Sequence, residues 1–498
     1  MGEQGKAVPS LVCLCAQKLV NDQASLRMML DSIPCDLYRP LFSAAFLGRK
    51  TLILQDLVQQ WPFSNLSFQK LLPGNLGQFH HLSNSVCVKA VIRGVVAYLS
   101  DALSRESQER RQRLRILDIT DDPCSFDLNE DHRSLRSHLM TLAKACIDLS
   151  KRCRDEAMQA RKRSDFKLAP QSSLNTVYVD VWIDIFNYST YYPILKEALQ
   201  ASVHGPLRLR CRNLHNCMMP LCKTGELLDL LNPAGVRRIE LYNIITLDEL
   251  NIILPNMVKF CSLRSVKLTF CINSIQRLKH DTMKKFATLI GQLSSLKELN
   301  LGYSFLSGCL QQLLGGIQEP LESLELGYCN LLPVDLYYLS ESHHISSLKK
   351  LDLRRHNLSE HLLPAFLQLL AAISSSLRYL DISMCQLSDH NLSVLVPTLC
   401  YCSHLRCLVL AMNPLSTRAL RSLSQNCAHL QELQLVVYSC PRDCYICGPF
   451  SVHYIDKEKL RGFVAELNEI LVRAERTDIV WARNMSVLHN PVYLNLWR

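Results

Sequence analysis

The chain is poor in glycine and has no long, uncharged apolar run. Only 17 of its 498 residues are glycine, which argues against large glycine-rich loops and against the turns of a β-propeller. No stretch of about eighteen uncharged apolar residues is present, so the sequence predicts no membrane-spanning helix. The opening MGEQGKAVPS leads into only a short apolar turn, unlike a signal peptide, and Lys6 stands where an N-myristoylation motif needs Ser or Thr. We therefore expect a cytoplasmic protein, with a nuclear location as the alternative.

The short motifs of common enzyme classes are also missing. The sequence contains no GxxxxGK[ST], no GxGxxG after a strand, no GxSxG and no HExxH. The tightest group of soft metal ligands is Cys440, Cys444 and Cys447, with His453 six residues on. Because no second CxxC pair accompanies it, we interpret this group as a loop with incidental thiols and not as a zinc site. We expect no enzymatic activity, no cofactor and no metal.

Cysteine, by contrast, is abundant. The 22 cysteines stand singly in apolar stretches such as LGYCNLL and ISMCQLS, where free cysteine acts as a small buried hydrophobe in a reducing compartment. The formal charge is +10, and much of it lies in two clusters, Arg105 to Arg115 and Lys151 to Arg163. The second cluster could be a bipartite nuclear signal, but a solvated helix face explains it at least as well. Charge pattern alone does not predict direct nucleic-acid binding.

The strongest pattern is an internal repeat of the form LxxLxLxxN/CxL. Successive first positions differ by 27, 33, 25, 27, 29, 28 and 25 residues. The longest interval holds extra polar residues around Asn273 to Asp281, which we assign to a loop insertion. The eight copies begin at Val236, Leu263, Leu296, Leu321, Leu348, Leu377, Leu405 and Leu430.

Each repeat combines a strand with a helix. Apolar and polar residues alternate within LxLxx, which is the period of a half-buried strand. Segments between the strands, such as 363–373 and 392–402, have apolar residues at helical spacing. No unit can bury its apolar face alone, so stacking produces a parallel sheet on the inside of a curve with helices outside. The predicted fold is α/β, a leucine-rich-repeat horseshoe with a helical cap at each end.

The ninth repeat position is expected to hold small buried residues. Asn413 there is expected to bond the backbone of neighbouring turns, and Cys271, Cys329 and Cys385 occupy the matching position in other repeats.

Flanking segments are expected to cap the array. Residues 8–72 show helical spacing punctuated by prolines, and 456–473 form an amphipathic helix. Residues 114–120 and 207–214 look like degenerate strands, and 177–186 look like a strand that pairs at the edge. The predicted organisation is an N-terminal helical region at 1–75, an N-terminal cap with degenerate repeats at 76–205, leucine-rich repeats at 206–440 and a C-terminal cap at 441–498.

One short motif carries a more specific prediction. Residues 10–19, SLVCLCAQKL, fit SLxxxCxxxL, the form of a BC box, which docks a helix onto elongin C. On a helix Leu11, Cys15 and Leu19 share one face, where a leucine and a small thiol can enter an apolar pocket. An amphipathic capping helix remains the alternative. A segment at 33–37 follows in the form ΦPxxΦ, which resembles a cullin-two box.

Longer stretches resemble the PRAME family. They include IPCDLYRPLFSAAFLGRKTLILQDLVQQWPF, LSGCLQQLLGGIQEPLESLELGYCNLLPVDL, LVLAMNPLSTRALRSL, PRDCY and VWARN. GRKT, LLPVDL and PRDCY are more similar to the leucine-rich-repeat-containing-14 branch of that family than to PRAME itself. The resemblance implies substrate receptors of cullin-two ubiquitin ligases with elongins B and C, and repression of NF-κB or retinoic-acid signalling by different members. By motif match, the residues expected to contact elongin C are Leu11, Cys15 and Leu19, and those expected to contact the cullin are Ile33, Pro34 and Leu37.

We therefore expect two binding surfaces. The N-terminal helices would dock elongin B/C and cullin-2 with its RING protein, and the inward face of the sheet would hold a client protein, since its mixed charge suits a protein better than a polyanion. Two alternatives stay open: an occluding scaffold that inhibits a signalling complex such as the IκB kinase in the NF-κB pathway, and a nuclear transcriptional cofactor. The client-binding candidates lie between the core leucines; they are Arg238, Glu240, Tyr242, Lys267, Glu298, Asn300, Glu325, Lys350, Asp352, Arg354, Tyr379 and Asp381.

Overall fold

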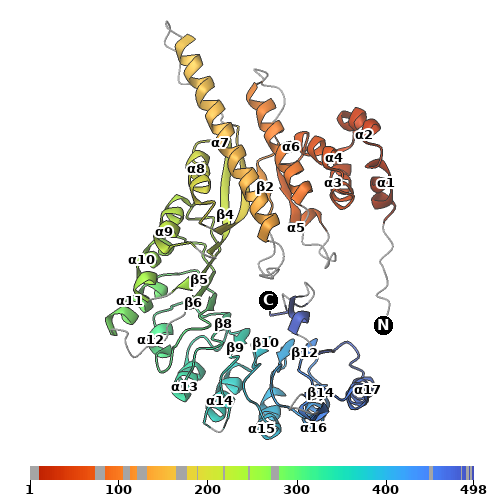
Figure 1. The fold of residues 1–498 in the computed structure, drawn as a ribbon, viewed down its shortest axis with the longest axis vertical. Coiled ribbons are helices and arrows are strands. Elements are labelled where there is room, and N and C mark those ends of the chain that lie inside the picture. The colour runs from red at the N-terminus through yellow and green to blue at the C-terminus, as the bar shows by residue number, and fades with distance from the viewer. Residues whose placement is uncertain are drawn as a thin grey trace. The chain divides into compact units, whose positions relative to one another are not determined.

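The chain divides into two units: the first begins with a group of helices, and strands alternate with helices through most of the second (Figure 1). Residues 1–215 and 226–235 make the first unit, and residues 216–225 and 236–498 make the second. Thirteen of the described strands follow one another in chain order, β1 to β12 and then β15. A helix able to cross a membrane is not found among the residues described. The computed structural model describes residues 10–72, 85–104, 113–120, 132–163, 177–187, 189–216, 219–244, 247–270, 280–359, 361–447, 453–483, 485–489, 493 and 496–497. Cys271 and most of the predicted insertion around Asn273 to Asp281 lie outside them.

The first unit begins with short helices packed around an aromatic cluster. The Phe42 ring lies 5.7 Å from that of Trp61 and 5.9 Å from that of Phe68. At Gly94 a Cβ atom would lie 2.7 Å from the carbonyl oxygen of Gln55, so glycine permits the close approach of two helices there. The elements are α1 (Leu11–Leu19), α2 (Gln23–Met29), 3-10 turns at Leu30–Ser32 and Cys35–Leu37, α3 (Tyr38–Leu47), α4 (Thr51–Gln59), β1 (Asn65–Ser67), α5 (Phe68–Leu71), α6 (Ser85–Ser104), β2 (Ile116–Asp118), α7 (His132–Arg163), β3 (Val179–Asn187), α8 (Tyr192–Ser202) and β4 (Leu207–Asn216), and α9 (Leu221–Leu230) spans the boundary between the units.

The strands predicted in the first unit are present, with one correction. β3 is not an edge strand, because it pairs in parallel with β2 and lies between β2 and β4 in the strand order. The edge is β1, in a segment predicted to be helical, where Leu66 pairs with Leu117. Alternation of polar and apolar residues shows that one face of a strand is buried, but it carries no information on the number of neighbouring strands.

The second unit consists of stacked strand and helix pairs. Leu351 of β9 pairs with Leu324 of β8 and with Leu380 of β10, and all three are fully buried against the helices. The opposite face of the sheet, called the inner face, carries the third and fifth residues of each repeat. The elements are β5 (Arg238–Ile244), α10 (Leu247–Val258), β6 (Ser265–Phe270), α11 (His280–Gly291), β7 (Glu298–Asn300), α12 (Leu310–Leu314), β8 (Ser323–Glu325), α13 (Pro333–Glu341), β9 (Lys350–Asp352), α14 (Leu363–Ile373), β10 (Tyr379–Asp381), α15 (Asp389–Leu399), β11 (Cys407–Val409), α16 (Thr417–Cys427), β12 (Leu435–Val437), β13 (Tyr445–Cys447), β14 (His453–Ile455), α17 (Lys457–Arg473), β15 (Val480–Ala482) and a 3-10 turn at Met485–His489.

The ninth repeat position has the predicted role. The Asn413 amide donates to the carbonyl oxygens of Ile382 and Leu410, each at 2.9 Å, and accepts the backbone N–H of Cys385 at 2.9 Å. Cys329 and Cys385 are fully buried at the same position of their own repeats. The side chain at this position therefore ties one turn to the next.

The last repeat is displaced by three residues from the predicted frame. β12 pairs with β11 so that Val436 lies beside Leu408. Leu433, 28 residues after Leu405, therefore takes the first position in place of Leu430. The prediction was wrong because Leu430, Leu433 and Leu435 fit the LxxLxL pattern, whereas the observed frame has Leu433, Val436 and Tyr438 at these positions. In the observed frame Leu435 and Val437 turn to the inner face.

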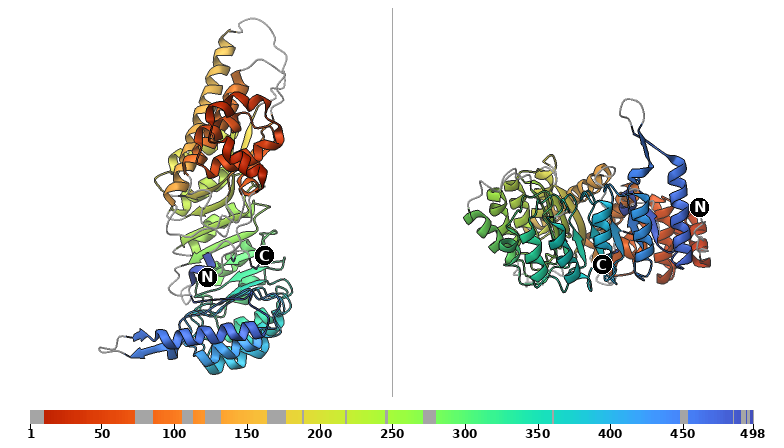
Figure 2. Two further views of the ribbon diagram at one scale, coloured as in Figure 1. Left: turned by 90° about the vertical axis from the view of Figure 1, so that its right-hand side faces the viewer. Right: turned by 90° about the horizontal axis from the view of Figure 1, so that it is seen from below.

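The C-terminal cap continues the array. The predicted helix is α17, whose N-cap Asp456 accepts the backbone N–H groups of Glu458 and Lys459. After α17, β15 pairs in parallel with β12 and extends the sheet. The antiparallel β13–β14 hairpin before α17 projects from this unit (Figure 2).

Candidate protein-interaction surfaces

The predicted BC-box residues form an exposed face of α1. Ser10 begins the helix, because its side chain accepts the backbone N–H of Cys13 at 3.3 Å. Leu11 is 76% exposed, Leu19 is 42% exposed and Cys15 is exposed as well. The helix buries Ala16 and packs against α3. The fold thus uses the opposite side of α1 and leaves the three predicted contact residues accessible.

The predicted cullin-binding residues lie in the connection between α2 and α3. The Tyr38 hydroxyl donates to the carbonyl oxygen of Leu30 at 3.2 Å, and the Leu37 N–H donates to that of Pro34 at 3.0 Å. These bonds fix the connection in one conformation. Pro34 and Leu37 are exposed, while Ile33 is half-buried. A partner could therefore reach the proline and the second hydrophobic residue more readily than the first.

Two methionines add exposed apolar surface that no motif indicated. Met28 is 88% exposed and Met29 is 52% exposed, both on α2 between the two predicted motifs. Methionine adapts to irregular apolar partners. The exposure of the two methionines follows from the orientation of α2, which buries Leu26. The sequence alone does not fix that orientation.

The predicted client-binding charges on the inner face are largely paired with one another. The Arg238 guanidinium of β5 lies 2.9 Å from the Glu298 carboxylate of β7. The Lys350 ammonium of β9 lies 2.6 Å from the Glu325 carboxylate of β8. All four side chains are largely buried, so a client would have to compete with an existing ion pair to use any of them. Burial opposes ionisation of Glu325, but Lys350 outweighs it and holds the pKa of Glu325 below its ordinary value.

The other polar candidates complete this network. Tyr242 donates to the Glu240 carboxylate, and the Lys267 ammonium lies 5.0 Å from the centre of the Tyr242 ring. The Asn300 amide donates to Glu325 at 2.6 Å. These side chains link adjacent strands along the inner face.

Asp352 and Asp381 have a structural role that their spacing did not reveal. Asp352 accepts the backbone N–H of Arg354, and Asp381 accepts that of Ser383, each at 2.9 Å. Both carboxylates are buried and stabilise the turn after their strand. Burial and the neighbouring Asp381 carboxylate raise the pKa of Asp352 to about 7, against the opposing effect of Arg354. Burial lowers the pKa of Arg354, but Asp352 and Asp381 outweigh it and raise that pKa above its usual range.

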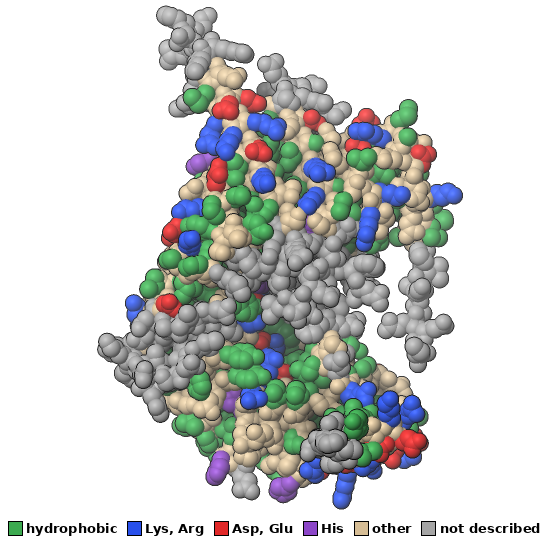
Figure 3. Space-filling model, in the orientation of Figure 1, with side chains coloured by type: hydrophobic (Ala, Val, Ile, Leu, Met, Phe, Trp, Pro, Cys, Tyr) green, Lys and Arg blue, Asp and Glu red, His purple; other side chains and the backbone are tan. Residues whose placement is uncertain are grey.

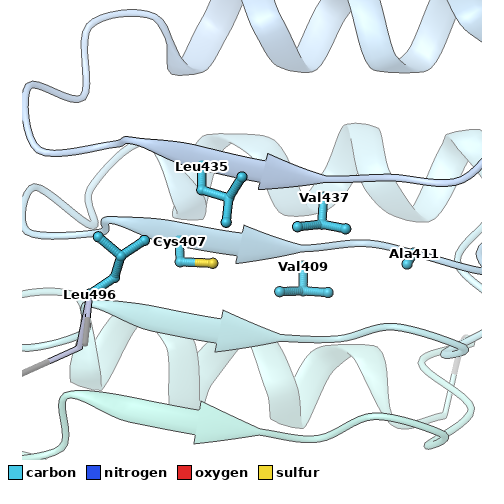
Figure 4. Close-up of a cluster of buried hydrophobic side chains, with 6 residues drawn as sticks. All are labelled: Cys407, Val409, Ala411, Leu435, Val437 and Leu496. Atoms are coloured by element: carbon cyan, nitrogen blue, oxygen red, sulfur yellow. The ribbon is translucent and has the colours of Figure 1, made fainter. Parts of the chain in front are cut away.

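The inner face becomes apolar at β11 and β12. Cys407, Val409, Ala411, Leu435 and Val437 form a buried cluster with Leu496 from the end of the chain (Figure 4). The side chains of Tyr379, Ala482, Met485, Leu488 and Tyr493 pack against this cluster. The sequence did not predict the β12 part of this surface, because Leu435 and Val437 do not face inward in the predicted frame of the last repeat.

The eighth repeat position forms a rim of large side chains in strained backbone. Tyr303, Tyr328, Arg355, Met384 and Met412 all have positive φ, between 58° and 66°. Bulky residues rarely adopt this conformation, which costs about 1–3 kcal/mol each. The rings of Tyr303 and Tyr328 stack with centroids 4.3 Å apart, and Met412 is 63% exposed. Tyr, Arg and Met are enriched in protein interfaces, so this rim is a further candidate surface.

The two basic clusters and the cysteine-rich segment were the remaining candidates from the sequence. Lys151 to Arg163 belong to α7, where Lys151 pairs with Glu197 at 3.1 Å, and most of the cluster at 105–115 lies outside the described residues. Basic and acidic side chains are interspersed on the face shown in Figure 3. In the cysteine-rich segment, burial raises the pKa of the Cys444 thiol to about 11. Cys447 lies opposite His453 in the antiparallel backbone pairing of β13 with β14. Among the described residues, no group of three or more His, Cys, Asp or Glu side chains could hold a metal ion.

Comparison with known proteins identifies the family. Leucine-rich repeat-containing protein 14 of Xenopus laevis is 50% identical over 503 residues, which is 96% of this chain and 98% of that protein. The human protein of the same name is 34% identical over 501 residues, covering 96% and 97%. Among solved structures, a chain of the yeast Rad7 and Elc1 complex aligns with 97% of this chain and 100% of its own length at 14% identity and a TM-score of 0.42. Legionella pneumophila LegL7 aligns with 58% and 98% at 14% identity and a TM-score of 0.35. Profiles of the PRAME N-terminal and C-terminal domains match residues 8–126 and 183–489, and the chain therefore belongs to the PRAME family.

Proposed function

We propose that this protein is the substrate receptor of a ubiquitin ligase built on elongins B and C and cullin-2 with its RING protein. It acts by binding, without catalysis of its own, and lowers the level of a client in signalling or transcription. The observation that carries the proposal is the exposed face of α1, on which Leu11, Cys15 and Leu19 match a BC box. The role that the PRAME family resemblance implies agrees with it.

The geometry of α1 suits a helix that enters a groove. At 3.6 residues per turn, Leu11, Cys15 and Leu19 fall within about 80° of one another around the helix. Ala16 and the following Val20 are buried against the unit, so a partner can cover the exposed face without unfolding α1. Burial of an exposed leucine contributes about 1.5–3 kcal/mol, which is enough for two leucines to dominate a small interface.

A pull-down with the full chain tests the proposal. Wild type is compared with Leu11→Ser/Cys15→Phe for capture of elongins B and C and cullin-2. Leu14→Ser is the matched control, because Leu14 is 46% exposed on the same helix but lies outside the predicted face. We expect wild type and the control to capture the complex and the double variant to lose it.

Circular dichroism must accompany the pull-down. Both substituted side chains are exposed, so each should change the free energy of unfolding by no more than about 0.5 kcal/mol. If folded wild type captures none of the complex, the receptor proposal is wrong.

In that case the second candidate takes its place. An occluding scaffold would bind a signalling complex such as the IκB kinase and block its assembly without ubiquitin. The rim of Tyr303, Tyr328, Arg355, Met384 and Met412 favours it, since this surface belongs to the repeats alone. Repression of an NF-κB reporter that survives Leu11→Ser/Cys15→Phe supports occlusion, and repression lost with elongin capture contradicts it.

A further inference from the structure

The last residues of the chain cover part of the inner face of the second unit. Leu496 is 7% exposed and belongs to the apolar cluster over β11 and β12. Tyr493 packs against the same cluster. Figure 4 shows Leu496 on the side of the sheet opposite the helices, beside Cys407.

The same segment reaches the predicted client-binding residues. Trp497 is 6% exposed, and its ring centre lies 5.6 Å from the Lys350 ammonium. Lys350 also lies 5.4 Å from the centre of the Tyr379 ring. An ammonium between two aromatic rings is stabilised by both. One of the twelve inner-face candidates, Lys350, is therefore already engaged by the C-terminal segment.

We propose that the inner face over β9 to β12 is a binding surface for a short apolar segment with a large aromatic residue, and that the C-terminal segment is its resident occupant. A client segment of the same chemistry would bind by displacing it. This inference rests on the proposed function only in taking the client to be a protein.

The chemistry of the occupant defines that of the client. An aliphatic side chain is required where Leu496 meets Cys407, and an aromatic one where Trp497 meets Lys350. The preferred client segment is therefore apolar and carries one large aromatic side chain.

A covalently attached occupant competes strongly. Attachment gives a segment an effective concentration in the millimolar range, so a free peptide must bind much more tightly than the tail to displace it. Weakening the two anchoring side chains should therefore open the surface to a free peptide without adding any contact.

The experiment measures binding of a fluorescent synthetic peptide with the sequence of residues 484–498 by anisotropy. The full chain carrying Leu496→Ser/Trp497→Ala should bind this peptide at least about tenfold more tightly than wild type does. A control peptide with the same two substitutions should not bind, and Val409→Asp in the variant chain should abolish binding. If the folded variant binds the peptide no better than wild type, the proposal is wrong.

A second measurement covers the case in which the variant fails to fold. In wild type, amide hydrogen exchange in the fragment that ends the chain should be at least about tenfold faster than in β11 and β12, as a displaceable occupant requires. Exchange as slow as in those strands would make the segment a fixed part of the core and overturn the proposal. Elongin capture should be unchanged by Leu496→Ser/Trp497→Ala, so failure of the receptor proposal and failure of this one are distinguishable.

Discussion

Replacing Arg476 with alanine should release the last helix and strand of the second unit. Arg476 is 7% exposed and clamps the connection between α16 and β12. Its guanidinium donates to the carbonyl oxygens of Ala428, Leu430 and Leu433 at 2.9, 2.6 and 2.8 Å. It also contacts the Asp478 carboxylate, at 2.9 Å. One side chain thus joins the segment after α17 to the preceding repeat.

The expected loss follows from these bonds. A hydrogen bond to a charged donor contributes about 1.5–3 kcal/mol, and the contributions of a shared group do not add fully. Asp478 is 56% exposed and regains water when its partner is lost, so the carbonyl groups account for most of the effect. We expect Arg476→Ala to cost about 3–5 kcal/mol locally. Arg476→Lys should recover only part of this, because an ammonium lacks the planar fork.

Hydrogen exchange followed by mass spectrometry measures the effect where it occurs. In a repeat array each unit contacts its neighbours, so exchange in α17 and β15 should accelerate while exchange in β7 to β9 stays unchanged. Equal protection of β15 in wild type and Arg476→Ala would refute the clamp. Uniform acceleration across all repeats would refute its local character.

Three further substitutions test other parts of the account. Met412→Asn should raise the free energy of unfolding by up to about 1 kcal/mol, because asparagine adopts the φ of 58° at lower cost and the exposed methionine side chain contributes little packing. An unchanged urea midpoint would show that the backbone at this position is not strained. Asn413→Ala should lower the free energy of unfolding by about 2–4 kcal/mol, because it leaves backbone groups of neighbouring repeats unpaired. A loss below about 1 kcal/mol would contradict this role of Asn413. Asp352 has a pKa raised from 3.8 to about 7, so the folded state binds its proton more tightly and this group makes the protein less stable as pH rises through that window. Asp352→Asn should therefore flatten the fall in Tm between pH 4 and pH 7, and a curve parallel to wild type would contradict the assignment.

The repeat architecture could be predicted because its determinants are local. Leu348, Leu351 and Leu353 bring the LxxLxL pattern into a fully buried row, and the period of about 27 residues leaves room for a helix. The α1 face was predictable for the same reason, since Leu11, Cys15 and Leu19 need only helical geometry to share a side.

The features that escaped prediction depend on contacts distant in sequence. The frame of the last repeat is set by pairing with β11, because Leu430, Leu433 and Leu435 fit one register and Leu433, Val436 and Tyr438 fit another. Trp497 reaches Lys350 across almost 150 residues, and Arg476 reaches Ala428 across 48. The pairing of the inner-face charges with one another, as in Arg238 with Glu298, could not be inferred from spacing alone.

The most direct test of the central claim is a calorimetric titration of purified elongin B/C into the full chain. Wild type should bind with one-to-one stoichiometry. Leu11→Ser should weaken binding by at least about tenfold, or about 1.4 kcal/mol, since it removes an apolar side chain that is 76% exposed in the free protein. Leu14→Ser should change the affinity by no more than about twofold. Absence of binding by folded wild type, or equal affinity for wild type and Leu11→Ser, would contradict the account.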